Sequence, residues 1–262
     1  MSQAAGRQYH IGLGEADIEG ARYALLPGDP GRVPQLARGV GARAVELGQH
    51  REHCSWLAYI AEQPVLVCST GLGAPSTAVA VEELANIGVT HFIRVGTSGS
   101  IQPHIDYSDL VISKAAVRLE GTSSHYAPLA YPAVASFELT ASLVASARAL
   151  DIPHHVGITA SSDTFWPGQE RYDNHSGYVL RRFQGSMAEW RQLKVTNFEM
   201  EAAALFTVCA TFGLSAACVC GVIAKRVESE EVRPEAYGLA EQRWNAVLAK
   251  TLGERLSRKP EK

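Results

Sequence analysis

The 262-residue sequence has little cysteine, no excess of basic residues and no long apolar run, and each shortage excludes a class of protein. Its five cysteines are odd in number and include no Cys-x-x-Cys pair, so neither a disulfide framework nor a structural zinc site is indicated. The formal net charge of -3 gives no basic field that would gather nucleic acid or an anionic membrane. No stretch reaches the roughly 18 apolar residues of a spanning helix, and residues 1–10 lack the apolar core of a signal peptide. We therefore expect a cytoplasmic protein that binds neither nucleic acid nor membrane.

The composition and the apolar pattern predict an α/β protein with one large core. With 46% hydrophobic residues, the chain can bury that core without disulfides or metal, which predicts a single domain over residues 1–262. Short apolar runs alternate with longer stretches of helical periodicity, which predicts a largely buried mixed sheet. The expected strands are 23–26, 65–69, 92–96, 110–113 and 219–224, and the expected helices are 76–87, 137–149, 199–212 and 235–256. Residues 165–190 form an insertion too long for an ordinary connection, so we expect it to carry function or to close over a site.

Three glycine-rich turns, at 26–32, 69–76 and 94–99, each follow an expected strand. Turns at the carboxyl ends of strands expose backbone N–H groups that can hold a phosphate, although each turn alone is as often a geometric necessity. Two of the turns carry an arginine, Arg32 and Arg94, and a third arginine, Arg51, precedes Trp56. Because one guanidinium group can donate two parallel hydrogen bonds to phosphate oxygens, the combination of turns and arginines predicts a bound phosphate.

The sequence also lacks the two common nucleotide-binding loops. Gly71-Leu72-Gly73 begins a dinucleotide-binding pattern, but its third glycine is replaced by Ser76, and no acidic residue follows about 20 positions later. No Gly-Lys-Ser/Thr occurs. The anion is therefore expected to be a small free phosphate.

Six short motifs resemble those of the bacterial uridine phosphorylases, a branch of the hexameric nucleoside phosphorylase family. They are PGDP at 27–30, CSTG at 68–71, RVGT at 94–97, SSDTF at 161–165, PGQERY at 167–172 and NFEME at 197–201. The resemblance runs from about residue 10 to residue 226. It implies a three-layer α/β fold with a mixed, distorted central β-sheet flanked by helices. It also implies the reversible reaction of uridine with inorganic phosphate to give uracil and ribose 1-phosphate, with deoxyuridine and thymidine as further candidate substrates.

The resemblance implies a role for particular residues in each part of a site. The phosphate-binding residues would be Gly28, Arg32, Arg94 and Thr97, with Arg51 from a neighbouring subunit. The ribose-binding residues would be Met200 and Glu201, with the neighbour's His10 near the 5′-hydroxyl. The base-binding residues would be Phe165, Gln169, Arg171, Ile223 and Arg226. The residues expected to be catalytic are Arg94, Glu201, Gln169, Arg171 and Arg226.

The resemblance further implies a homo-oligomer, expected to be a hexamer built from dimers with shared active sites. No metal or organic cofactor is required, and phosphate is a co-substrate. A structural potassium ion between subunits is suggested at Glu52, Leu72 and Ser76. The sequence by itself gives no indication of that ion.

The chemistry of the reaction fits these residue types. Breaking the glycosidic bond develops positive charge on the sugar and negative charge on the departing uracil, so a site needs an anion on one side and donors on the other. Phosphate is both nucleophile and countercharge. The Gln169 amide can pair with an N–H and a carbonyl of uracil, and Arg171 adds donors to a carbonyl.

Several of these residues also have ordinary structural interpretations. Glu199 and Glu201 fit an exposed acidic pair at a helix start, where the dipole favours negative charge. Met200 could simply fill space in the hydrophobic core. His10 fits a surface or packed histidine, and Glu170 fits a solvated or structural charge.

The stretch 222–226 favours a pyrimidine over a purine substrate. In purine phosphorylases and related nucleosidases, an aspartate after this strand protonates the leaving base, and no carboxylate is present here. The uridine enzymes carry Val-Asn at Ala224-Lys225 and Thr at Ser98. These differences leave open the direction in which the charged Lys225 side chain points and whether the site accepts 5-substituted uracils.

Two other functions compete with phosphorolysis. A nucleosidase would use water in place of phosphate, but three arginines would then have no anion to bind. A nucleoside-binding module without catalysis is the alternative from a different class. Product formation with and without phosphate separates the three.

Overall fold

The computed structural model describes residues 6–227, 229 and 231–257, so the expected domain of residues 1–262 extends beyond the described residues at both ends. The strands are β1 (Tyr23–Leu26), β2 (Arg43–His50), β3 (His53–Ile60), β4 (Gln63–Cys68), β5 (His91–Ser100), β6 (Leu110–Leu119), β7 (Ala133–Val134), β8 (His154–Ser162), β9 (Val195–Glu199) and β10 (Ser215–Lys225). The α-helices are α1 (Val33–Val40), α2 (Ala74–Asn86), α3 (Phe137–Ala149), α4 (Ser186–Gln192), α5 (Ala202–Thr211) and α6 (Pro234–Ser257). The 3-10 helices are η1 (Glu15–Ile18), η2 (Pro30–Arg32), η3 (Thr122–His125), η4 (Pro167–Gln169) and η5 (Arg181–Phe183).

The strands form one mixed sheet that closes partly on itself. The order is β10-β6-β8-β9-β5-β1-β4-β3-β2, with β7 beside β6. In addition, β10 pairs with β5 in parallel and with β6 antiparallel. The strands β5, β10, β6, β8 and β9 therefore form a closed ring, and β1, β4, β3 and β2 continue the sheet outward from β5. This arrangement confirms the mixed, distorted sheet that the resemblance implied.

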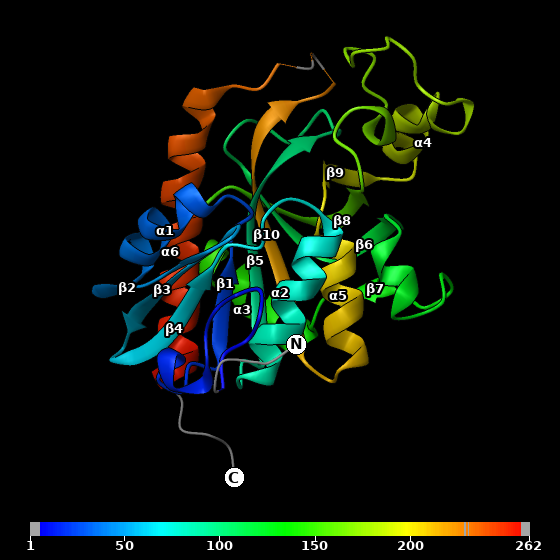
Figure 1. Ribbon diagram of the computed structural model, residues 1–262. Coiled ribbons are helices and arrows are strands. Elements are labelled where there is room, and N and C mark those ends of the chain that lie inside the picture. The colour runs from blue at the N-terminus through cyan, green and yellow to red at the C-terminus, as the bar shows by residue number, and fades with distance from the viewer. Residues whose placement is uncertain (1–5, 228, 230, 258–262) are drawn as a thin grey trace.

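Helices cover both faces of the sheet, because neighbouring residues on its strands point to opposite sides. On β1, Ala24 and Leu26 pack with α2 and α5, whereas Tyr23 and Leu25 pack with α1, α3 and α6. Figure 1 shows α1 and α6 on one side of the sheet and α2 and α5 on the other. The three-layer prediction is confirmed.

The helix expected at 199–212 begins three residues late, at Ala202. Glu199 is the last residue of β9 instead, because it pairs with Ser161 of β8. Within the described residues, no helix is long and apolar enough to cross a bilayer. All five cysteines are buried and free, and Cys218 and Cys220 lie on one face of β10 with their sulfurs 3.6 Å apart.

Candidate functional site

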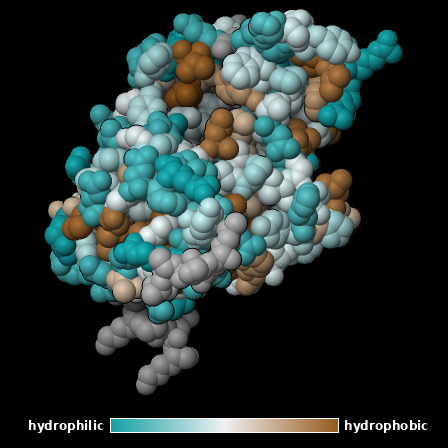
Figure 2. Space-filling model, viewed as in Figure 1, coloured by the Kyte–Doolittle hydropathy of each residue, from teal (hydrophilic) through white to brown (hydrophobic). Residues whose placement is uncertain are grey.

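A cavity of about 330 Å³ lies where the carboxyl ends of β1, β4, β5 and β10 meet. These strands are parallel, so the turns that follow them open at one edge of the sheet. The insertion, the end of β9 and the residues that follow it supply further parts of the wall. The upper part of the molecule is hollowed in the space-filling view (Figure 2), where hydrophobic side chains lie among hydrophilic ones. The sequence-predicted residues that line the cavity are Gly28, Arg32, Leu72, Arg94, Thr97, Phe165, Gln169, Arg171, Met200, Glu201 and Ile223.

Arg94 lies on β5 in the wall of this cavity and is held by two carboxylates. Its Nε donates to Glu199 Oε2 at 2.7 Å, and its Nη2 forms an ion pair with Glu201. Burial opposes its charge, but Glu201 and Glu199 together keep the pKa of Arg94 above its ordinary value. Gly96 makes room for this arrangement, because a Cβ there would lie 2.8 Å from Arg94 Nη2. The result is a fixed, buried cation at one end of the cavity.

The two carboxylates are themselves fixed by backbone groups. Glu199 accepts from the N–H groups of Glu201 at 2.8 Å and Ala202 at 2.9 Å, so its charge lies at the N-terminus of α5. Glu201 Oε1 accepts from Gly73 N at 2.6 Å. Burial raises the pKa of Glu201, with Arg94 opposing and Glu199 adding to the rise. Because Glu199 and Glu201 are 4% and 2% exposed, the alternative of an exposed acidic pair is wrong.

The other expected phosphate-binding residues gather near Arg94. Arg32 lies on η2, where Asp29 accepts from Gly31 N at 2.8 Å and so fixes the start of the turn. Arg32 Nη2 is 3.5 Å from Thr97 Oγ1. Gly28 lies so close to the next turn that a Cβ would be 3.2 Å from the Gly71 carbonyl oxygen. This end of the cavity thus combines two guanidinium groups, a hydroxyl and glycine backbone.

The opposite end carries the expected base-binding residues, which come from the insertion and from β10. Gln169, on η4, is buried at the cavity wall, and the Arg171 guanidinium lies 4.4 Å from the Phe165 ring centroid. Arg226 does not line the cavity: it lies behind Gln169, with Nη2 donating to the Gln169 carbonyl at 2.7 Å. Arg226 therefore supports the base end of the cavity from outside it.

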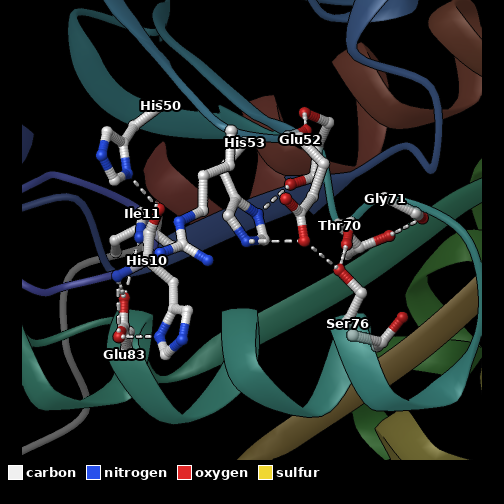
Figure 3. Close-up of polar contacts among 12 residues, drawn as sticks. His10, Ile11, His50, Glu52, His53, Thr70, Gly71, Ser76 and Glu83 are labelled. Atoms are coloured by element: carbon white, nitrogen blue, oxygen red, sulfur yellow. Dashed lines mark hydrogen bonds and ion pairs between the residues drawn. The ribbon is translucent and has the colours of Figure 1, made fainter.

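His10 does not line the cavity and lies beside α2. Its Nδ1 is 2.7 Å from Glu83 Oε1, and the backbone N–H groups of His10 and Ile11 donate to the same carboxylate. Figure 3 shows the side chains of His10 and Glu83 pointing toward each other beside this helix. Arg51, in the turn between β2 and β3, donates to the Tyr9 hydroxyl at 3.1 Å. Neither His10 nor Arg51 lines the cavity of its own chain.

The residues suggested for potassium are only partly brought together. Ser76 Oγ donates to Glu52 Oε1 at 3.1 Å, as Figure 3 shows, while Leu72 is exposed at the mouth of the cavity. Leu72 has no side-chain oxygen, so only its backbone carbonyl could serve such an ion. In the described part of the chain, no group of three or more His, Cys, Asp or Glu is arranged to hold a metal.

Sequence reasoning missed Glu199 and Gly96 as site residues. Glu199 had a signal, since it stands two positions before Glu201 within the NFEME motif at 197–201. Gly96 belongs to the glycine-rich segment 94–99, but the sequence did not show that the Arg94 guanidinium packs closely against it. Glu170 was interpreted as a solvated or structural charge. Its carboxylate accepts a hydrogen bond from the N–H of Met187 at 2.6 Å, near the start of α4, which is a structural role.

The chain is similar to known phosphorolytic enzymes over most of its length. It is 52% identical to uridine phosphorylase of Escherichia coli (strain K12) over 222 residues, 85% of this chain and 87% of the relative. It is 47% identical to uridine phosphorylase of Thermococcus kodakarensis over 244 residues, 93% of this chain and 84% of the relative. Guanosine phosphorylase of Halorubrum lacusprofundi is 34% identical over 82% of this chain and 83% of the relative. Because residues 22–256 match the family model described as "Phosphorylase superfamily", the chain belongs to that superfamily.

Proposed function

We propose that this protein is a uridine phosphorylase, which converts uridine and inorganic phosphate into uracil and α-D-ribose 1-phosphate. The observation that carries the proposal is the layout of the cavity. Buried Arg94 lies with Arg32 and Thr97 at one end, and Gln169 and Arg171 lie at the other. Cations that hold an anionic phosphate at one end balance the positive charge that develops on the sugar, and amide and guanidinium donors at the other end balance the negative charge on the departing base.

In this reaction a phosphate oxygen forms a bond to C1′ of the ribose while the bond from C1′ to N1 of uracil breaks. The bonding electrons leave with uracil, which then takes up a proton. Arg94 and Arg32 hold the phosphate, and Glu201 and Met200 hold the ribose between the two ends. Arg94 is already fixed by Glu199 and Glu201, so little side-chain freedom is lost when the anion binds.

The base end favours uracil over a purine. Among the described residues, the acidic ones that line the cavity are Asp29, Glu199 and Glu201; they belong to the phosphate and ribose end, and no described carboxylate lines the base end. A leaving purine would therefore lack an acid to protonate its ring nitrogen. The amide of Gln169 and the guanidinium of Arg171 instead offer the donors and the acceptor that a uracil edge needs.

The active enzyme is proposed to be a cytoplasmic homohexamer built from dimers, with no required metal or organic cofactor. Support for shared sites comes from His10 and Arg51. His10 is expected to bind ribose and Arg51 to bind phosphate, but neither lines the cavity of its own chain. Each would complete the site of a neighbour. A structural potassium ion at Glu52, Leu72 and Ser76 is part of the same proposal.

The test is an assay of uridine, thymidine, inosine and guanosine at several phosphate concentrations. We expect uracil to form from uridine only when phosphate is present, with ribose 1-phosphate as the second product. Product without phosphate would identify a nucleosidase. Nucleoside binding without turnover would identify a binding module, and preference for inosine or guanosine would identify a purine enzyme.

A further inference from the structure

Glu170 stands in the insertion between two residues of the base end, but it does not itself line the cavity. Gln169 before it and Arg171 after it both belong to the cavity wall. The backbone of Glu170 lies in the left-handed region, with φ of 54° and ψ of 44°. A glycine would adopt this conformation with less strain. A glutamate at such a position therefore indicates that its side chain is used.

The Glu170 carboxylate binds two backbone N–H groups at the start of α4. Gly185 N donates to Oε1 at 2.5 Å, and Met187 N donates to Oε2 at 2.6 Å. The Tyr172 hydroxyl donates to Oε1 at 3.2 Å, and the Ser186 hydroxyl lies 3.5 Å from Oε2. Each carboxylate oxygen thus has its own amide donor, and both of these hydrogen bonds are strengthened by the negative charge. A glutamine could not replace it, because its single oxygen would accept from one N–H and its NH2 group would face the other.

Helix α4, to which Glu170 is attached, is itself fixed on the sheet. Its residues Met187 and Trp190 pack against a buried cluster that includes Phe198 of β9, and Phe198 also lines the cavity. Arg191 Nε donates to the carbonyl of Ile101, the residue after β5, at 3.0 Å. The helix therefore gives the insertion a firm point of attachment beside the cavity.

The base-end turn, residues 166–171, is held together by its own hydrogen bonds. Arg171 N donates to the Trp166 carbonyl at 2.8 Å, which closes the turn. At its other side, Gly168 N donates to Thr164 Oγ1 at 2.8 Å, near the end of β8. A turn closed in this way moves largely as one body. The attachment of its carboxylate to α4 therefore sets the direction of the side chains on either side of that carboxylate.

We propose that Glu170 is a positioning residue for the nucleobase, because its carboxylate ties the base-end turn to α4 and so holds Gln169 and Arg171 against the cavity. The inference rests on the proposed function, which assigns the base to this end. Arg226 holds the same turn from β10, through the Gln169 carbonyl. Loss of the carboxylate should therefore loosen the turn without unfolding it.

The experiment uses the full-length protein with Glu170→Gln and Glu170→Gly. The glutamine keeps the size of the side chain but turns one acceptor into a donor, whereas the glycine removes the carboxylate and the backbone strain together. The matched control is Glu189→Gln, because Glu189 is an exposed carboxylate on the same helix and does not line the cavity. We expect both Glu170 variants to lower kcat/KM for uridine about five- to tenfold, with KM for phosphate changed by less than about twofold. The control should behave as the wild type does.

Hydrogen exchange separates a positioning role from a purely local one and needs no substrate. In both Glu170 variants the amides of Gly185 and Met187 lose their acceptor, so they should exchange faster in any case. Positioning further requires faster exchange at residues 168–171 than in the wild type and in Glu189→Gln. Mass spectrometry of peptides that separate residues 166–171 from residues 185–187 measures both.

The proposal would be overturned by unchanged kcat/KM for uridine, by an equal rise in KM for phosphate, or by exchange that changes only at residues 185–187. A loss in Glu170→Gln that Glu170→Gly did not share would also overturn it, because the misplaced NH2 group and not the missing carboxylate would then be the cause. If the wild type does not split uridine with phosphate, the proposed function fails. Exchange at residues 168–171 then still decides whether Glu170 holds the base-end turn.

Discussion

Arg94 keeps a full charge inside the protein because its two partners are held in place by backbone groups. Glu199 is fixed by the first amides of α5 and Glu201 by Gly73, so the guanidinium is held before any ligand arrives. A side chain that is ordered in advance loses little conformational freedom when it binds an anion. If Arg94 binds phosphate as proposed, the strength of that contact depends on Glu199, Glu201 and Gly73, which hold the guanidinium in place.

Replacing Arg94 by alanine should lower kcat/KM on the order of a hundredfold or more, because a charged contact to the attacking anion is lost. The phosphate dependence of the rate is the measurement. Since the substitution also leaves two buried carboxylates without their cation, melting temperature is recorded alongside, and Arg94→Lys serves as the control that keeps the charge. A variant whose phosphate dependence matched the wild type would refute the role of Arg94.

Gln169→Leu tests the base end. The leucine fills a similar volume but leaves an N–H and a carbonyl of uracil unpaired in a closed pocket, which costs on the order of 1 to 3 kcal/mol. We expect that loss in kcat/KM for uridine and a smaller one for inosine. If the variant discriminates between the two nucleosides as well as the wild type does, Gln169 does not recognise the base.

At this scale the sequence could predict which residue types meet in the cavity but not all of their positions. Gly28 and Arg32 follow β1, and Thr97 lies near the carboxyl end of the neighbouring β5, so the expected order of strands was sufficient to bring them together. Arg226 was expected in the pocket, yet it lies behind Gln169. Its position depends on how the end of β10 packs against the insertion, and no local sequence pattern predicts that contact.

Among the elements, buried apolar strands and periodic helices were predictable. The strand 23–26 and the helix 137–149 occur at the expected bounds, because β1 is buried throughout and α3 repeats its apolar residues at helical spacing. Strands β3, β8 and β9 were not predicted, since each mixes polar residues such as His53, Thr159 and Asn197 into buried positions. Their hydrogen-bond partners are distant in sequence: Thr159 donates to Asn197 Oδ1, and His53 Nδ1 lies 2.8 Å from the Ser69 carbonyl oxygen.

Glu83 attaches the N-terminal segment to α2, and this attachment should depend on pH. Although burial acts to raise it, the pKa of Glu83 is lowered by hydrogen bonds from Ile11 and His10. A lowered folded-state pKa means that the stabilisation is complete above the unfolded value of 4.5 and is lost as pH falls below it. Glu83→Gln should therefore destabilise the protein by on the order of 1 to 2 kcal/mol at pH 7, and hardly at all near pH 3.

Urea unfolding at several pH values and one protein concentration measures this effect. The control is Glu82→Gln on the same helix, because Glu82 accepts from the neutral Tyr126 hydroxyl and should show no comparable dependence. A difference between wild type and Glu83→Gln that stayed constant with pH would contradict the assignment.

The molecule as a whole raises the question of how many chains complete one site. His10 and Arg51 lie outside the cavity of their own chain. Around a two-fold axis, each chain would lend these residues to the other. The expectation can be tested with two inactive variants, His10→Ala with Arg51→Ala and Gln169→Leu with Arg226→Ala.

When equal amounts of the two variants are refolded together, about half of the dimers should be mixed, and each mixed dimer has one undamaged site. Activity should return to about a quarter of the wild-type level. Exchange of subunits is verified by pull-down of a tagged chain. If chains exchange and no activity returns, the sites are not shared.

The closed ring of β5, β10, β6, β8 and β9 also determines when a newly made chain acquires its site. Strand β10 is the last strand along the chain, yet it pairs with both β5 and β6. Until residue 225 has left the ribosome, those two strands keep unpaired edges, and the cavity lacks the wall formed by Ile223 and Ala224. A chain that ends before β10 therefore lacks both the partner strand for these two edges and one wall of the cavity.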